Sequence, residues 1–245
     1  MNSGLIKPQF LLFDNPEITK SEYDTLLTFL LVFVIMACVK VNSNGVVHML
    51  NYEKILELAK ENNGIVTTSM VVREGVSRGI LKYLSDSGAL EKTSRGVYML
   101  PDAWEDEFVN VSSRYKRGIF SLETALYLCD LTDRTPNRFH MTFPATYNLT
   151  GPKNEGIICS GSKEPYYSLG VATLKTPGGN EVRGYCAERS LCDVLNPRNH
   201  TDIQIISDAY KKYVLRKDRN IPLLSEYARK LHVEEKLRTY LEVLL

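Results

Sequence analysis

The first clear pattern of apolar and polar positions along the chain, beginning near residue 52, has the period of a helix. From Tyr52 to Asn62 the apolar residues recur every three to four positions, with charged residues between them. Asn51 can cap the start of this helix, and Gly64 follows its end. The pattern predicts a first, supporting helix.

A second and shorter helix is expected after an extended link at Ile65–Val66. Either Thr67 or Thr68 can cap it, because threonine side chains accept hydrogen bonds from the first turn of a helix. The helix then contains residues 70–72 and stops at Gly75. The spacing predicts a tight turn before the next helix.

The third predicted helix has two distinct faces. Ser77 can cap its start. Its apolar positions share one face: Ile80, Leu81 and Leu84. Its other face carries Arg78, Gly79, Lys82 and Asp86. An apolar stripe that fixes the helix, opposite a face with basic or small early residues, is what a DNA recognition helix requires.

Two strands joined by a tight turn are predicted next, at 89–93 and 97–100. The turn is Ser94-Arg95-Gly96, and Pro101 ends the second strand. Three helices followed by a hairpin predict a winged helix-turn-helix, whose wing would bring Lys92 and Arg95 to the DNA phosphates. The expected DNA-binding residues are Thr68, Ser77, Arg78, Gly79, Lys82, Lys92 and Arg95.

The rest of the chain predicts a mixed α/β region. Residues 102–113 are acidic and carry Trp104, so we expect a connector that packs at one spot. Helices are expected at 122–129, capped by Ser121, and at 186–196, 202–216, 222–231 and 233–245. Strands are expected at 138–143, 157–159, 166–175 and 181–185, with a hairpin turn at 177–180. The fold class is therefore α+β, with a winged helix at 49–101, a connector at 102–113 and a mixed domain at 114–245 that ends in helices.

Residues 1–48 stand apart from this plan. The run from Leu26 to Val39 is the most apolar stretch, but it is shorter than the roughly 20 residues that a membrane-spanning helix needs. Three interpretations stay open: a short anchor, a buried helix, and an extension upstream of the working protein through a mis-assigned start. We favour the extension, because a self-contained domain begins at Met49.

Composition and charge exclude several classes of protein. The 245 residues carry a net charge of +1, so DNA affinity must come from local clusters of basic residues. Five cysteines without a C-x-x-C pair argue against a disulfide framework or a zinc site and favour a reduced, cytoplasmic protein. We expect no catalytic residues, metal or cofactor, because no nucleotide-binding, hydrolase or metalloprotease motif occurs.

The segment TTSMVVREGVSRGILKYLSDSGALEKTSRGVYMLP resembles the winged helix of the AbiEi family, the antitoxins of type IV toxin-antitoxin and abortive-infection systems. The likeness extends to short motifs in the second region: His140, Thr142 and Pro144 in one strand, and Glu188, Arg189 and Asp193 in one helix. Spacing alone makes Arg189 and Asp193 able to pair across one helical turn.

The resemblance implies an autorepressor that binds inverted repeats before its own operon. It also implies a partner toxin of the nucleotidyltransferase-like kind, opposed without a stable complex, and DNA binding as a homodimer or cooperatively. Two alternatives stay open. One is a metal-dependent nuclease using Asp133, Glu164 and Glu181, and the other is a ligand-sensing regulator unrelated to any toxin.

Overall fold

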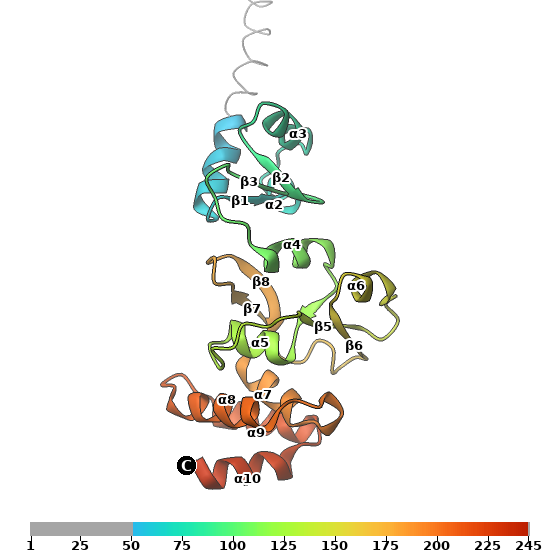
Figure 1. Ribbon diagram of the computed structural model, residues 1–245, viewed down its shortest axis with the longest axis vertical. Helices are drawn as coiled ribbons and strands as arrows, with labels where there is room; N and C mark the ends of the chain where they lie inside the picture. The colour runs from blue at the N-terminus through green and yellow to red at the C-terminus, as the bar shows by residue number, and fades with distance from the viewer. Residues whose placement is uncertain (1–50, 245) are drawn as a thin grey trace, which may run out of the picture. The chain divides into compact units, whose positions relative to one another are not determined.

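The computed structural model describes residues 51–244, and of these residues 54–244 belong to one compact unit of the chain. Two β-sheets with helices packed against them make up the described part (Figure 1), so the predicted α+β class is confirmed. Residues 1–48, with the apolar run at Leu26–Val39, lie outside the described residues. The three interpretations of this segment therefore stay predictions. No helix within residues 51–244 is both long and apolar enough to cross a membrane.

The first sheet has three short antiparallel strands in the order β1-β3-β2. They are β1 (Ile65–Thr67), β2 (Glu91–Ser94) and β3 (Val97–Met99). Residues 51–61 are helical, and the helices α2 (Thr68–Arg73) and α3 (Gly79–Asp86) lie between β1 and β2 in the chain. The predicted order of three helices and a hairpin is therefore present, and the extended link at Ile65–Val66 is a third strand of the sheet.

The second sheet has five strands in the order β6-β5-β4-β8-β7. They are β4 (Ile119–Phe120), β5 (His140–Pro144), β6 (Ile158–Ser162), β7 (Val171–Lys175) and β8 (Glu181–Tyr185). The pairs β4–β8 and β5–β6 are parallel, whereas β4–β5 and β7–β8 are antiparallel. The two-residue strand β4 thus joins the parallel pair β5–β6 to the antiparallel hairpin β7–β8.

Helices surround the second sheet and continue to the end of the described chain. They are α4 (Glu107–Arg114), α5 (Leu122–Leu128), α6 (Thr150–Asn154), α7 (Ala187–Leu195), the 3-10 turn η1 (Pro197–Asn199), α8 (Ile203–Leu215), α9 (Ile221–Lys230) and α10 (Glu234–Leu244). The predicted helices α5, α7, α8, α9 and α10 are confirmed, with ends shifted by at most one residue.

Helix α4 lies between the two sheets (Figure 1) and joins them in one apolar cluster. Phe108 and Val109 of α4 pack in the same cluster as Ile65 and Met99 of the first sheet and Phe143 of the second. Each fully buried side chain of this size contributes roughly 1.5–3 kcal/mol relative to exposure. The predicted connector therefore contains a buried helix, and the division of the chain into domains at residues 102–113 stays a prediction.

Trp104 does not supply the expected packing spot, because its side chain is 91% exposed. The packing comes instead from α4, whose start is fixed by Asp106. The Asp106 carboxylate accepts hydrogen bonds from the backbone N–H groups of Phe108 and Val109, and also from Thr176 Oγ1 and Asn180 Nδ2 of the β7–β8 hairpin. A single buried carboxylate thus caps α4 and ties it to a hairpin about seventy residues later in the chain.

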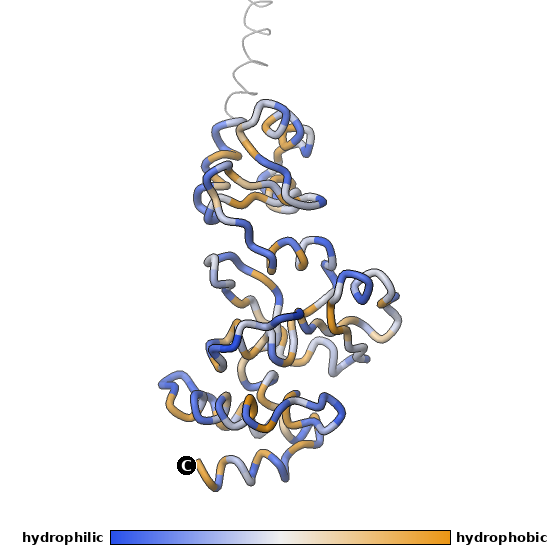
Figure 2. The backbone as a smooth tube through the Cα atoms, in the orientation of Figure 1, coloured by the Kyte–Doolittle hydropathy of each residue, from blue (hydrophilic) through white to orange (hydrophobic). Residues whose placement is uncertain are grey.

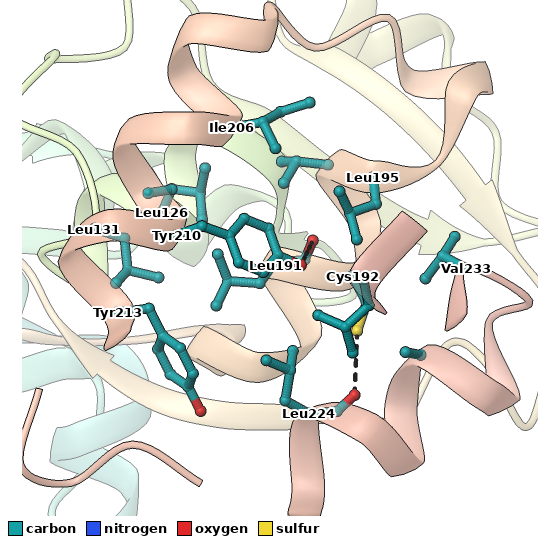
Figure 3. Packing of buried hydrophobic residues seen from close by; sticks show 14 of the residues in the cluster. Leu126, Leu131, Leu191, Cys192, Leu195, Ile206, Tyr210, Tyr213, Leu224 and Val233 are labelled. Atoms are coloured by element: carbon teal, nitrogen blue, oxygen red, sulfur yellow. Dashed lines mark hydrogen bonds between the residues drawn. The ribbon is translucent and has the colours of Figure 1, made fainter. Parts of the chain in front are cut away.

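A second apolar cluster fills the space between α5, α7 and the C-terminal helices (Figure 3). Tyr210 is fully buried there and donates a hydrogen bond to the Leu191 carbonyl, and the Cys192 thiol approaches the Leu224 carbonyl at 3.6 Å. Burial raises the pKa of the Cys192 thiol, so this cysteine serves as a small apolar residue. Hydrophobic and hydrophilic positions alternate along α8, α9 and α10 (Figure 2), as the helical pattern predicts.

Two local predictions in this region have different outcomes. Ser121 is the N-cap residue of α5, but its side chain makes no capping bond; its buried Oγ has no hydrogen-bond partner within the described residues. Arg189 and Asp193 do pair, with Nε 3.0 Å from both carboxylate oxygens. Burial raises the pKa of Asp193 to about 6, although the Arg189 guanidinium opposes this shift.

Candidate nucleic-acid interface

The start of α2 is fixed by Thr67, which follows directly from β1. Thr67 Oγ1 accepts a hydrogen bond from the Met70 N–H at 3.3 Å, and the Met70 sulfur accepts one from the Thr67 N–H at 3.4 Å. This reciprocal arrangement satisfies two N–H groups that a helix start would otherwise leave free. Of the two expected caps, Thr67 is therefore the one used.

The turn between α2 and α3 depends on Gly75. Its φ of +73° lies in the left-handed region that side chains disfavour, and the N–H of Val76 returns to the Val71 carbonyl at 3.1 Å. Val71 and Val76 are buried beneath the turn. The turn therefore directs the start of α3 away from α2 while keeping its apolar face on the core.

Helix α3 has the two faces that the sequence predicts. Ile80, Leu81 and Leu84 are at most 6% exposed, so they fix the helix on the core. The residues of the opposite face are exposed: Arg78, Gly79, Lys82 and Asp86. The helix thus presents its first basic side chains to solvent on a rigid support, which is the arrangement needed to enter a DNA groove.

The expected role of Ser77 needs a small correction. Arg78, not Ser77, occupies the N-cap position of α3, and the helix begins at Gly79. The Ser77 hydroxyl still accepts a hydrogen bond from the Gly79 N–H at 3.4 Å. Ser77 therefore stabilises the first turn of α3 from the position before the N-cap residue. Helix boundaries commonly differ by one residue from those expected from the sequence.

The wing consists of β2, β3 and a two-residue turn, Arg95-Gly96, one residue shorter than the expected turn. Gly96 has a φ of +81°, and the register shifts between Lys92 and Ser94. The shift is a β-bulge, which increases the local twist of the hairpin. Lys92 and Arg95 are both exposed, so the basic tip expected of the wing is present.

Thr68 lies at the junction of α2 and the wing. Its Oγ1 donates to the Gly96 carbonyl at 3.3 Å, and its backbone N–H donates to the same carbonyl at 2.9 Å. These two bonds hold the wing turn against the start of α2. The structure therefore gives Thr68 a supporting role, and its direct contact with DNA stays a prediction.

Two residues near this surface were absent from the sequence-based set. Tyr83 follows Lys82 on α3 and is 59% exposed, between the outward positions Gly79 and Asp86. Tyr83 lies four residues after Gly79, so the helical period alone could have placed it on the same outward face. Lys116, far along the chain, donates to Ser69 Oγ on α2 at 3.1 Å, and no local pattern could have predicted that contact.

Acidic residues near the interface are partly neutralised. Glu74, at the end of α2, forms an ion pair with Lys54 at 2.9 Å. Arg78, Lys82, Lys92 and Arg95 have no ion-pair partner among residues 51–244. The cations of α3 and of the β2–β3 hairpin can therefore bind an external anion such as the phosphate groups of DNA.

Two of the three carboxylates of the nuclease alternative, Asp133 and Glu164, have local partners. Asp133 forms an ion pair with Lys212 at 2.7 Å, Glu164 accepts hydrogen bonds from Ser168, and Glu181 lies at the start of β8. Within residues 51–244 no group of three potential ligand side chains is placed to hold a metal ion. The structure therefore does not bring the three proposed residues together.

The segment that forms this interface matches a known family. Residues 53–101 match the family model described as transcriptional regulator, AbiEi antitoxin. The match supports the AbiEi family. It covers the first sheet with α2 and α3, and thus supports a DNA-binding antitoxin regulator.

Comparison with solved structures finds a distant similarity. The crystal structure of the RV2827C protein from Mycobacterium tuberculosis is similar over 71% of this chain and 69% of that chain, with 14% sequence identity and a TM-score of 0.44. No curated protein sequence matches the chain.

Proposed function

We propose that this protein is the antitoxin and transcriptional autorepressor of a type IV toxin-antitoxin operon of the abortive-infection kind. The observation that carries the proposal is the exposed basic surface formed by α3 and the wing. Four of its cations lack ion-pair partners within the described residues, and they lie in the segment that matches the AbiEi antitoxin regulators.

The proposed binding mode follows from the two parts of this surface. Helix α3 enters the major groove, where Arg78 and Lys82 reach guanine edges or phosphates and Gly79 allows close approach. The wing places Lys92 and Arg95 on the flanking phosphates, which add affinity without reading sequence. Ser77 and Thr68 hold the two parts in position.

One such unit buries only about 600–1,000 Å² of protein surface on DNA, which is small for operator-level affinity. Two copies on the halves of an inverted repeat, about one helical turn apart, would raise the affinity through a homodimer or through cooperative binding. We therefore propose that the operator is an inverted repeat before the protein's own operon. The proposed site of action is the cytoplasm, where that DNA lies.

The proposed partner is a nucleotidyltransferase-like toxin encoded beside this protein. The AbiEi match supports a toxin partner in general terms. We propose that the two proteins oppose each other without a stable complex, and that residues 114–245 carry the neutralising activity. Growth of cells that express the toxin, with and without this chain, tests the pairing, and co-purification tests the absence of a complex.

Operator binding is tested by fluorescence anisotropy with DNA from upstream of the gene. We expect Lys82→Ala to weaken binding by about 5- to 150-fold, since one good base contact contributes about 1–3 kcal/mol. Lys60→Ala is the matched control, because Lys60 is an exposed lysine of the helix at residues 51–61 and lines a different surface pocket. Equal operator affinity for the Lys82→Ala variant and the wild type would contradict the assignment of α3 as the recognition helix.

A further inference from the structure

A polar cavity of about 460 Å³ lies in the second region of the protein, well separated in sequence from the winged helix. Its walls come from β5, β6, the segment after β6, α7 with η1, and the junction of α9 with α10. Most of its lining residues are polar or charged, among them Lys163, Arg189, Asp193 and Arg198. A volume of this size falls within the range of small-molecule sites.

The charges around this cavity do not balance. Four cationic side chains line it: Lys163, Arg189, Arg198 and Lys230. Asp193 is the lining carboxylate, and it is engaged with Arg189 at 3.0 Å. Lys230 has an external partner in Glu226 at 2.6 Å. Lys163 and Arg198 have no ion-pair partner anywhere in the described part of the chain.

Arg189 serves as the fixed wall of this cavity. Its side chain is 6% exposed, and its Nη1 donates to the carbonyls of Tyr166 and Leu169 at 2.8 and 3.0 Å. Its guanidinium carbon also lies 4.6 Å from the centre of the Tyr185 ring. These bonds hold the segment 166–169 beside α7, so the cavity is preorganised by the protein itself.

Hydroxyl groups and one aromatic ring complete the lining. Thr142 and Ser160 are paired neighbours on the parallel strands β5 and β6, and Ser162 lies two residues further along the same face. Tyr166 is 40% exposed at the cavity. Hydroxyls and unpaired cations suit phosphate oxygens, and an exposed aromatic ring offers a flat surface on which a base can stack.

We propose that this cavity, the phosphate pocket, binds a mononucleotide. Lys163 and Arg198 hold its phosphate groups, the hydroxyls of Ser160 and Ser162 donate to the phosphate oxygens, and Tyr166 stacks on the base. A solvated cluster of surface charges would explain the lysines alone. It would not explain why two unpaired cations, two hydroxyls and an exposed ring share one concave site with a buried arginine at its wall.

The phosphate pocket does not depend on the proposed function, because none of its residues belongs to the winged helix. Its occupancy is therefore tested on the full chain without DNA. Isothermal titration calorimetry is carried out with ATP, GTP, adenosine, inorganic phosphate and a short 5′-phosphorylated oligonucleotide. The last probe separates a free nucleotide from the end of a nucleic-acid chain as the source of the phosphate.

We expect ATP or GTP to bind at least about tenfold more tightly than adenosine, because charge-assisted contacts to phosphate are the strong ones. Lys163→Ala and Arg198→Ala should each weaken nucleotide binding by about tenfold or more. Both side chains are exposed, so the variants should fold like the wild type, and circular dichroism checks this. Lys175→Ala, which removes an exposed lysine of β7 outside the pocket, is the matched control.

Tyr166→Ala should weaken nucleotide binding while leaving inorganic phosphate unaffected, because only the base contacts the ring. Several results would overturn the proposal: no binding of either nucleotide, equal loss in the Lys175→Ala control, or affinity unchanged in both cation variants. If the oligonucleotide bound more tightly than the mononucleotides, the proposal of a free nucleotide would be overturned, and the ligand would be the phosphorylated end of a nucleic acid.

Discussion

The winged helix and the second sheet carry similar residue types but use them in opposite ways. In the winged helix the cations at Arg78, Lys82, Lys92 and Arg95 are exposed and without ion-pair partners within the described residues. Around the second sheet Asp106 and Arg189 are nearly fully buried, and each makes several hydrogen bonds. The exposed cations of the first region are available for binding, whereas the buried charges Asp106 and Arg189 of the second region stabilise the fold.

The largest expected effect is a loss of stability on removal of a buried charge in the second region. Arg189→Ala should lower the free energy of unfolding by about 3–5 kcal/mol, because it leaves the Asp193 carboxylate buried without its partner. Urea denaturation followed by circular dichroism measures the loss. The double variant Arg189→Met/Asp193→Leu removes both charges and should lose less. If the double variant were less stable than the single one, desolvation of Asp193 would not be the cause.

Asp106→Ala should have the next largest effect, a loss of about 2–3 kcal/mol. The change removes a helix cap and leaves Thr176 and Asn180 without their charged acceptor. The same denaturation experiment measures it, with Asp102→Ala as the control, since Asp102 is an exposed carboxylate nearby. A loss no larger than that of the control would mean that the link between α4 and the β7–β8 hairpin contributes little.

The exposed cations should affect binding and not stability. Lys92→Ala and Arg95→Ala should each lower affinity equally for operator and unrelated DNA and reduce the salt dependence by about one counterion per residue. Lys82→Ala should instead reduce the preference for operator. Anisotropy titrations at several salt concentrations separate these two patterns. A loss of operator preference in the wing variants would place sequence reading in the wing as well.

The smallest expected effect concerns His140. Burial lowers the pKa of its imidazole below the ordinary value of 6.5, and its Nδ1 has no hydrogen-bond partner in residues 51–244. A depressed pKa means that the folded state binds the proton less readily than the unfolded chain. Stability due to this group is therefore present above about pH 6.5 and is lost as the pH falls below it. Urea midpoints from pH 7.5 to pH 5.5 should fall less in His140→Asn than in the wild type.

The elements predicted from the sequence are those in which the periodic pattern of apolar residues extends over enough positions to be recognised. Helices α3, α7 and α8 were expected because eight or more residues repeat the helical period, and β5 because the six residues 138–143 alternate. The strands β1 and β4 have three and two residues, too few for any alternation. They form only because partner strands supply hydrogen bonds from elsewhere in the chain.

Helix α4 shows a different limit. Its segment appears as an acidic connector, and its cap is shared with Thr176 and Asn180, about seventy residues away. The phosphate pocket has the same property, because Lys163 and Arg198 meet only after β6 and α7 are in place. The faces of α3 could be predicted locally, whereas sites assembled from distant segments could not.

The apolar cluster around α4 has a consequence for any shortened version of the protein. Ile65, Val97 and Met99 are buried partly by Phe108 and Val109, which follow the winged helix in the chain. A fragment ending at residue 101 would leave these side chains facing water and would be prone to aggregate. A single proteolytic cut between residues 101 and 106 would expose the same surface if the halves came apart. Loss of the second half would then remove the proposed repression without altering any residue that is proposed to contact the operator.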